Sequence, residues 1–353
     1  MSIKARIAVI GTGWWGTDYH LPGLQANPDV AITAICDSDP ARLEKAAQAF
    51  PGPHPYTNYQ EMLSKEELDG AIVVTPHSTH FAIARDCLTH GLHVLIEKPM
   101  TLFARDAGQL VQLAKTQGKE LMVSYPSLFY PPAQRAHEVF LSGELGEPHY
   151  VINSFTSDMT HFLGGNVSKD NPPLTWYKVQ GPSDAYNQPE LMGGGQGHLQ
   201  LTHGLGLLFY VTGLRARCVN ARMSSHGRKV DMIDAISMEF ENGALGIVGS
   251  SGETRVGAGV MLNVLCEKGA LLLDSTLPAA VIRRLDGNLE DLSKLGYHGS
   301  RYAVTEHFVA AVLKRQVNQA PGEVGQRVVE VLDAAYRSAR QDGQPVYVAD
   351  LYL

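Results

Sequence analysis

The chain has 353 residues, of which 44% are hydrophobic and 18% charged, and its formal net charge is -7. This ordinary globular composition excludes intrinsic disorder and fibrous architectures. The excess of acidic residues gives no electrostatic support for binding nucleic acid or anionic membranes. The length predicts two domains, or one large one.

Neither the cysteines nor the N-terminus indicates an exported or membrane protein. The four cysteines, Cys36, Cys87, Cys218 and Cys266, lie far apart without metal-ligand spacing, so reduced thiols are favoured over a redox or metal site. The apolar run before Gly11 is too short for a signal peptide, and no stretch approaches the ~20 apolar residues of a membrane span. We therefore expect a soluble, cytoplasmic protein.

The first third of the chain alternates short apolar runs with helical patterns. Strands are expected at 6–10, 31–36, 71–75, 93–97 and 121–124, with helices between them at 15–27, 40–50, 81–90 and 104–118. Strands at this spacing predict an α/β fold with a doubly wound parallel sheet and right-handed crossovers. Because these strands are β-branched and apolar throughout, both faces of the sheet are expected to be covered.

After Tyr125 the pattern changes to an α+β arrangement. Helices are expected at 133–142, 197–213, 302–315 and 326–341, and strands at 149–154, 219–223, 232–240, 244–250, 260–266 and 270–274. Short turns between the later strands predict a large, mainly antiparallel sheet. Residues 156–195 read as a long irregular loop, of the kind that often carries function. The sequence thus predicts a nucleotide-binding domain over 1–124 and an α+β domain over 125–353.

The clearest local motif is a glycine-rich turn that directly follows a strand and opens a helix, Gly11-Thr12-Gly13-Trp14-Trp15-Gly16. Gly11 permits the tight turn, Gly13 lets a pyrophosphate approach the backbone, and Gly16 lets the helix pack close to the strand. The helix N-terminus adds free N–H groups and a partial positive charge. The motif predicts a dinucleotide-binding site, against the alternative of a simple glycine turn.

An acidic residue at the end of the second strand indicates which dinucleotide binds. Asp37 lies 21 positions after Gly16, where a carboxylate accepts both hydroxyls of the adenosine ribose of NAD. A 2′-phosphate ~4 Å away would be repelled by about 4 kcal/mol at an effective dielectric near ~20, unless a cation intervenes. Arg42 is the one candidate nearby, and we interpret it as a solvated helix residue. NAD is therefore favoured over NADP.

A second motif, within His93–Pro99, places an ionisable pair at the carboxyl end of a parallel strand, where open α/β sheets bind ligands. Burial and neighbouring charge can lower the pKa of a lysine such as Lys98 toward ~7–8, which suits proton exchange with an alcohol. Glu97 is a candidate to orient the nicotinamide ribose or the lysine. The alternative is a surface salt bridge before a turn-forming proline.

Four segments together resemble the glucose–fructose oxidoreductase / inositol dehydrogenase / rhizopine-catabolism (Gfo/Idh/MocA) family: GTGWWG, Thr75-Pro76-His77-Ser78-Thr79-His80, GLHVLIEKP and Ala334-Ala335-Tyr336-Arg337-Ser338-Ala339. The resemblance spans nearly the whole chain. It implies a Rossmann domain and an open-sheet C-terminal domain through which members often form homodimers or homotetramers. It also implies hydride exchange between NAD(P) and a sugar or cyclitol carbinol. Lys98 matches the family's catalytic lysine, and Thr75, Pro76, His77 and His80 match positions lining the nicotinamide side.

The C-terminal half departs from the family pattern, which has a glycine run, an aspartate, a histidine four residues later, and a second aspartate. His203 falls on the family histidine, while Leu199 and Gly206 replace the two aspartates. The segment from Tyr125 to Phe129 stands where arginines are usual. His203 is the leading partner of Lys98 as general base, with a structural histidine as the alternative.

Because the family's substrate-side aspartate is missing, other groups must hold the substrate hydroxyls. The candidates are Tyr125, Asp158, Thr160, His161, Trp176, Tyr177, His198 and Gln200, besides Lys98 and His203 themselves. Trp176 is expected either to stack on a sugar face or to hold the long loop in place. Two histidine pairs, His77 with His80 and His198 with His203, form no convincing ligand set with nearby carboxylates, so no metal is expected.

Three functions fit these motifs. The first is an NAD-dependent dehydrogenase of a sugar, sugar derivative or cyclitol. The second is an NAD-dependent glycoside hydrolase that oxidises its substrate transiently, eliminates the aglycone, adds water and reduces the product back, for instance on a modified or sulfonated sugar glycoside. The third is a nucleotide-binding regulator that has lost catalysis, against which the retained Lys98 and His203 argue.

Overall fold

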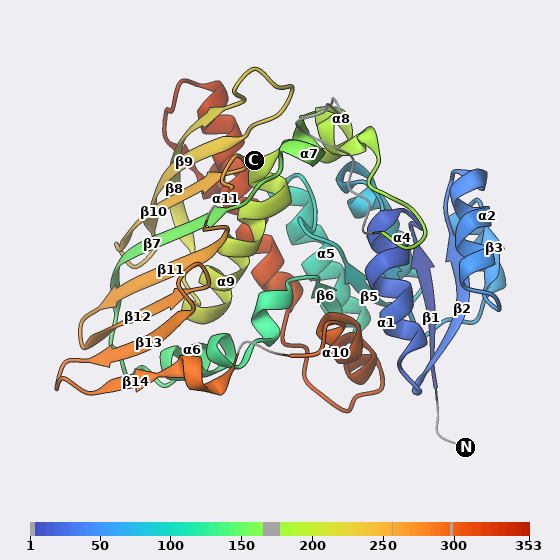
Figure 1. Ribbon diagram of the computed structural model, residues 1–353, viewed down its shortest axis with the longest axis horizontal. Coiled ribbons are helices and arrows are strands. Elements are labelled where there is room, and N and C mark those ends of the chain that lie inside the picture. Colours follow the sequence, from blue (N-terminus) through green and yellow to red (C-terminus); the bar gives the residue numbers. More distant parts are fainter. Residues whose placement is uncertain (1–3, 165–176, 256, 297–298) are drawn as a thin grey trace.

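The computed structural model describes residues 4–164, 177–255, 257–296 and 299–353. Two sheets flank a layer of helices (Figure 1). The first has the order β3-β2-β1-β4-β5-β6, and every neighbouring pair is parallel. Its strands are β1 Ala5–Ile10, β2 Val30–Cys36, β3 His54–Tyr56, β4 Gly70–Val73, β5 His93–Ile96 and β6 Leu121–Val123. The predicted parallel sheet is confirmed.

Helices connect the strands of this sheet, as the alternating pattern predicts. They are α1 Leu21–Gln25, α2 Pro40–Ala49, α3 Tyr59–Lys65, α4 His80–Thr89 and α5 Ala104–Gln117. The helix expected over 15–27 begins instead with a π-helical turn, Gly16–His20. Helices on both faces explain why β4 and the inner part of β5 are wholly buried and carry apolar side chains throughout.

Two elements, β3 and α3, were not expected from the sequence. β3 contains Pro55, which cannot donate to a ladder, and it lies at the edge of the sheet, where proline is tolerated. α3 begins after Asn58, whose side chain accepts hydrogen bonds from the amides of Gln60 and Glu61. The position at the sheet edge and the Asn58 cap therefore account for two elements in a segment where the sequence pattern predicts none.

The second sheet has nine strands in the order β14-β13-β12-β11-β7-β10-β9-β8-β15. They are β7 Pro148–Thr156, β8 Ala216–Ser224, β9 Ile233–Phe240, β10 Leu245–Ser251, β11 Gly259–Cys266, β12 Gly269–Asp274, β13 Ala279–Arg284, β14 Leu289–Asp291 and β15 Val346–Tyr347. Only the β7–β10 pair is parallel among those described, so the mainly antiparallel sheet is confirmed. The last three strands were not expected.

One face of the second sheet packs against helices that separate it from the first sheet (Figure 1). These are α6 Pro131–Leu141, α9 Thr202–Thr212 and α11 Gly322–Arg340. α10, Ala303–Val312, instead packs against α1, and its Phe308 lies under β4 beside Gly70. A segment that follows the second sheet thus returns to support the first.

The segment expected to be one long loop contains short ordered elements in its described part. They are α7 Thr160–Leu163, a 3-10 turn Asp184–Asn187 and α8 Pro189–Met192. The helix expected over 197–213 is divided into a π-helical turn, Gly197–Leu201, followed by α9. Across the described ranges, none of the helices has both the length and the apolar character needed to span a membrane.

Candidate functional site

The parallel strands of the first sheet deliver their following residues to one edge. Gly11 comes directly after β1, Asp37 after β2, Thr75 shortly after β4, and Glu97 and Lys98 after β5. These strands are neighbours in the sheet order, so the motifs found separately in the sequence converge at the carboxyl edge.

The glycine-rich turn forms a cradle that side chains would fill. Gly11 has φ +105°, and a Cβ there would lie 2.5 Å from the carbonyl oxygen of Val74. A Cβ on Gly16 would lie 2.3 Å from the carbonyl oxygen of Gly11, whereas a Cβ on Gly13 would meet nothing within 4 Å. Two glycines are thus required by close packing, and the third leaves open space where a pyrophosphate fits.

The two tryptophans of the motif point to different partners. Trp14 packs against Phe162 of α7, with ring centroids 5.3 Å apart, and so joins the turn to the C-terminal half. Trp15 stacks on Tyr19 at 5.0 Å, and its indole N–H donates to Glu97 Oε1 over 3.0 Å. The Trp15 side chain therefore joins the glycine-rich turn to Glu97 at the carboxyl edge of the sheet.

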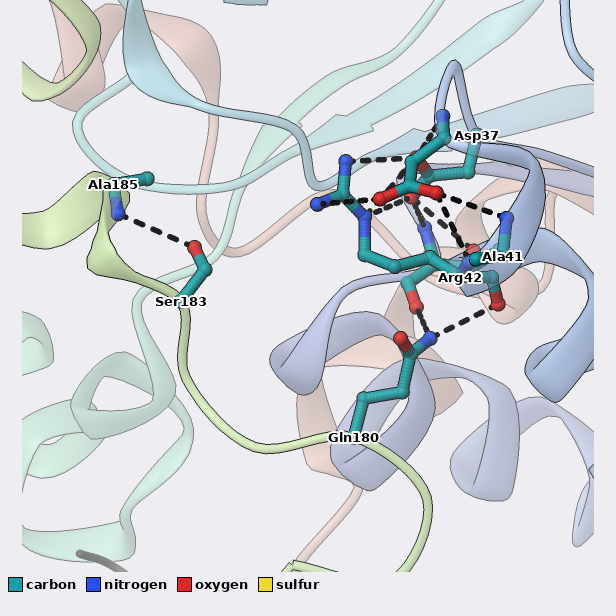
Figure 2. Close-up of polar contacts among 8 residues, drawn as sticks. Asp37, Ala41, Arg42, Gln180, Ser183 and Ala185 are labelled. Atoms are coloured by element: carbon teal, nitrogen blue, oxygen red, sulfur yellow. Dashed lines mark hydrogen bonds and ion pairs between the residues drawn. The ribbon is translucent and has the colours of Figure 1, made fainter.

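Asp37 is held by both the glycine-rich turn and α2 (Figure 2). Its Oδ2 accepts hydrogen bonds from the Thr12 amide at 2.9 Å and the Thr12 hydroxyl at 3.2 Å. Arg42 Nη2 forms an ion pair with Asp37 Oδ1 at 3.1 Å. The interpretation of Arg42 as a solvated helix residue is therefore wrong, because its guanidinium reaches back to the carboxylate at the end of β2.

A segment of the C-terminal half closes over this corner. The Gln180 side-chain amide donates to the carbonyl oxygens of Thr12 and, at 3.1 Å, of Arg42 (Figure 2). Gln180 is buried although it lies in an irregular stretch between Tyr177 and Asp184. We call residues 177–188 the covering segment, since the Gln180 amide joins it to the glycine-rich turn.

Glu97 is a buried carboxylate that other groups keep ionised. Its Oε1 accepts from Trp15 and also contacts His20 Nε2 at 2.9 Å, while the Lys98 amide donates to Oε2 at 3.2 Å. Burial alone would raise the pKa of Glu97, but the His20 hydrogen bond and charge, with the Lys98 charge, lower it to about 2. Glu97 thus supplies a permanent negative charge beside Lys98.

Lys98 reaches from the first sheet into the second half of the chain. Its Nζ donates to the carbonyl oxygen of Leu199, in the π-helical turn before α9, over 2.7 Å. Burial lowers the pKa of Lys98 to about 8, although the Glu97 charge opposes the shift. An amine with this pKa exchanges a proton readily near neutral pH.

His203 lies in the first turn of α9, just beyond that π-helical turn. Its ring is 6.1 Å from Tyr125 and 5.8 Å from Phe155, centroid to centroid. Burial, and then the charge of Lys98, lower the pKa of His203 well below its usual value. Its imidazole is therefore neutral at physiological pH, and no hydrogen bond occupies either nitrogen among the residues that the structure describes.

The two histidines after β4 face the interior. His80 is fully buried, with Nδ1 2.9 Å from the Pro99 carbonyl and Nε2 2.8 Å from the Thr75 carbonyl. It thereby joins the loops that follow β4 and β5. His77 Nδ1 lies 3.0 Å from the Met192 carbonyl, whereas Pro76 between Thr75 and His77 is exposed.

The substrate candidates are dispersed. The His198 ring is buried against Tyr336, 4.4 Å away and nearly parallel, and burial lowers its pKa to about 4. Tyr125 is fully buried, and its hydroxyl lies 3.2 Å from the Thr202 hydroxyl. Asp158 accepts from both the amide and the hydroxyl of Thr160.

The remaining candidates lie around the long segment. Gln200 approaches the Met159 sulfur at 3.2 Å, His161 lies in α7, Tyr177 is exposed, and Trp176 is outside the described residues. Among these candidates, the charge of Lys98 acts on the His203 imidazole, and the charge of His161 acts on the Asp158 carboxylate.

Several site residues had no signal in the sequence. His20 and Gln180 belong to no motif, and their partners lie 77 and 168 residues away. Among the described residues, no group of three or more His, Cys, Asp or Glu side chains is placed to hold a metal ion.

Known families account for both halves. A family profile described as the oxidoreductase family, NAD-binding Rossmann fold, matches residues 5–125, and the GFO/IDH/MocA C-terminal domain matches residues 133–272. The chain belongs to the Gfo/Idh/MocA family. Residues 5–125 form an NAD-binding Rossmann domain, and the residues of the glycine-rich cradle fit that cofactor.

Relatives support an oxidoreductase. An uncharacterized oxidoreductase of Synechocystis sp. is 26% identical over 288 residues, covering 78% of this chain and 72% of that protein. The dTDP-3,4-didehydro-2,6-dideoxy-alpha-D-glucose 3-reductase of Streptomyces antibioticus is 30% identical over 155 residues, 44% of this chain and 47% of the enzyme, so the match spans about half its length. GenD2 from gentamicin A biosynthesis, solved with NAD, is 25% identical with a TM-score of 0.76, covering 98% of this chain and 97% of that one.

Proposed function

We propose that this Gfo/Idh/MocA protein exchanges a hydride between NAD and a secondary hydroxyl of a sugar, sugar derivative or cyclitol. The observation that carries the proposal is the partly buried Lys98, with a pKa of about 8, beside an ionised Glu97 and near a His203 imidazole that the lysine's charge helps to keep neutral. Such a group at the carboxyl edge of a parallel sheet is suited to acid–base work on an alcohol. The reductase of a deoxysugar among its relatives supports this substrate class.

The chain's own groups handle the proton. When bound, NAD takes the hydride from the carbinol carbon or returns it in the reverse direction. His203, neutral and without a hydrogen-bond partner in the described chain, takes the hydroxyl proton as general base. Lys98 donates a hydrogen bond to the same oxygen and shares the proton, while Glu97 keeps the lysine's charge partly balanced.

NAD is the preferred form of the cofactor in this proposal. The Asp37 carboxylate is held by Thr12 at the position that accepts the ribose hydroxyls. Arg42 is committed to Asp37 by its ion pair, so its charge offsets the carboxylate only in part. A 2′-phosphate would displace this pair or remain close to a like charge.

The covering segment favours a second candidate, the redox-assisted glycoside hydrolase. In that cycle the sugar is oxidised to a ketone, the acidified neighbouring C–H loses its proton as the aglycone leaves, water adds, and the ketone is reduced again. NAD then returns to its starting state and need not leave. The Gln180 amide, buried on the nucleotide-binding turn, would slow its release.

We also propose that a second copy of the chain covers the outer face of the second sheet. Leu245 and Ile247 on β10 are 57% and 51% exposed, and they pair in register with Tyr150 and Ile152 on β7. Leu265 on β11 pairs with Tyr150 from the other side. These side chains form a contiguous apolar patch at the centre of the sheet, of the kind that marks an interface.

Nucleotide content and turnover together test the two activities. The purified protein is analysed for bound NAD and then screened against polyols and glycosides with and without added NAD. For a dehydrogenase, NADH appears in step with an oxidised sugar. For the hydrolase, free sugar is released without NADH accumulating. The control is Lys98→Gln, which is expected to be inactive in both assays. Activity retained in Lys98→Gln would contradict both.

Loss of the Gln180 amide is expected to speed NAD release. Gln180→Ala removes the hydrogen bonds to the glycine-rich turn, and the dissociation rate of NAD, followed by stopped-flow fluorescence, should rise roughly tenfold. Gln188→Ala is the matched control, because that amide bonds only to Asp184 within the covering segment. Equal release rates in Gln180→Ala and the unaltered protein would show that the segment does not retain the cofactor.

The oxidation rate is expected to rise with pH through a midpoint near the Lys98 pKa of about 8, because only the unprotonated lysine can share the proton that His203 takes from the hydroxyl. The reductive rate should fall over the same range. Glu97→Gln removes the charge that raises the Lys98 pKa, so the midpoint should move down by about one unit. Steady-state pH profiles check this, and a midpoint unmoved by Glu97→Gln or still present in Lys98→Arg argues against the assignment.

Removing the carboxylate at the end of β2 is expected to relax cofactor choice. In Asp37→Ser the ratio of kcat/KM for NADP over NAD should rise roughly 100-fold, because the carboxylate that repels the 2′-phosphate is gone and Arg42 is free to bind this phosphate. Glu44→Gln, an exposed carboxylate on α2, is the control. An unchanged ratio in Asp37→Ser would refute the role of Asp37 in selecting NAD.

A charge in the outer patch is expected to dissociate the dimer. Ile247→Asp should weaken self-association roughly 100-fold in sedimentation velocity, because an unpaired carboxylate would be buried. Leu285→Asp, on the exposed turn between β13 and β14, should leave it unchanged. A monomeric unaltered protein at micromolar concentration would overturn the proposed interface.

A further inference from the structure

The turn that receives Lys98 is itself held by Asp231, a buried residue just ahead of β9. Its Oδ1 accepts from the Gly195 amide at 2.7 Å and its Oδ2 from the Gly197 amide at 2.8 Å. Its backbone carbonyl accepts from the Gln196 amide at 2.9 Å. One residue thus binds three consecutive amides at the start of the π-helical turn.

The glycines of this stretch are required by that contact. A Cβ on Gly195 would lie 2.1 Å from the Asp231 carbonyl oxygen, and one on Gly194 2.1 Å from the Tyr336 hydroxyl. A Cβ on Gly197 would lie 2.7 Å from the same hydroxyl, which donates to Asp231 Oδ1 over 2.8 Å. The backbone can therefore reach the Asp231–Tyr336 pair only where no side chain intervenes.

Two residues after Gly197, the carbonyl of Leu199 accepts the Lys98 ammonium at 2.7 Å, and α9 with His203 follows directly. We propose that Asp231 is a positioning residue for Lys98: by holding the amides of Gly195 and Gly197 it fixes the turn whose carbonyl receives the lysine. The catalytic importance of the Lys98 position rests on the proposed function, whereas the hydrogen bond from Lys98 to the Leu199 carbonyl does not. Asp231 touches neither Lys98 nor the glycine-rich cradle.

Asp234, three residues along, offers a matched control. It is also buried, and its Oδ2 accepts from the Ser250 hydroxyl at 2.5 Å. Burial, the charge of Asp231 and a side-chain hydrogen bond to Asp231 raise the pKa of Asp234 well above its usual value, which favours the neutral acid. Asp234→Asn therefore keeps a neutral side chain that can donate to Asp231, whereas Asp231→Asn replaces an acceptor by a donor that faces an amide.

The experiment compares Asp231→Asn with Asp234→Asn in the full chain with NAD. Acylation of Lys98 by a small anhydride across a pH series, read by peptide mass spectrometry, titrates the lysine without requiring turnover. In Asp231→Asn we expect the midpoint to fall below about 8, because the ammonium loses its carbonyl acceptor. We expect kcat to drop roughly 10- to 100-fold with NAD affinity unchanged. Asp234→Asn should match the unaltered protein in all three readouts.

Two further variants separate geometry from charge and from folding. Asp231→Glu keeps the charge but displaces the carboxylate, so it should resemble Asp231→Asn; a wild-type labelling curve would overturn the proposal. If Asp231→Asn does not fold, Tyr336→Phe removes one hydrogen bond to the carboxylate and should shift the midpoint in the same direction by less. A loss of kcat in Asp234→Asn equal to that in Asp231→Asn would also overturn the proposal. A shifted Lys98 titration in a protein without dehydrogenase or hydrolase turnover would retain Asp231 as the positioning residue and reject the proposed function.

Discussion

The site depends on keeping a lysine ammonium out of water without leaving it unpaired. Desolvation makes Lys98 useful, because it lowers the pKa to about 8, but an isolated buried charge would be too costly to hold. Glu97 from the first sheet and the Leu199 carbonyl from the second half compensate it. Because Lys98 needs partners from both halves of the chain, it can be desolvated only when the two halves are packed together. The site therefore forms when the two halves pack.

Main-chain atoms shape both ends of this site. In the Rossmann domain, Gly11 and Gly16 let the glycine-rich turn pack closely against backbone carbonyls, and in the C-terminal half Gly195 and Gly197 let a second turn pack against Asp231 and Tyr336. A Cβ at any of these four positions would come within 3.0 Å of a neighbouring oxygen. The two glycine-rich stretches therefore permit close packing in the same way, although only the first follows a recognisable spacing.

Local patterns explain what the sequence could predict. The parallel sheet and the placement of Asp37 and Lys98 at its edge follow from strand, turn and helix signals within a few residues of each other. Gln180 and Asp231 could not be found that way, because their partners come from other elements, and Arg42 looked solvated because an ion pair to Asp37 leaves no trace in periodicity. The domain boundary after residue 124 and the roles of Lys98 and His203 stay predictions.

The contact between Lys98 and residue 199 uses a backbone oxygen, which gives this position an unusual kind of robustness. Replacing the Leu199 side chain leaves the acceptor in place, so the family aspartate is absent here without removing a partner for the lysine. The number of residues in the π-helical turn matters instead. Deleting one residue from Gly197–Leu201 would turn the carbonyl by roughly a quarter of a turn around the helix axis. At position 199, the length of this turn therefore constrains the lysine contact more tightly than the identity of the side chain does.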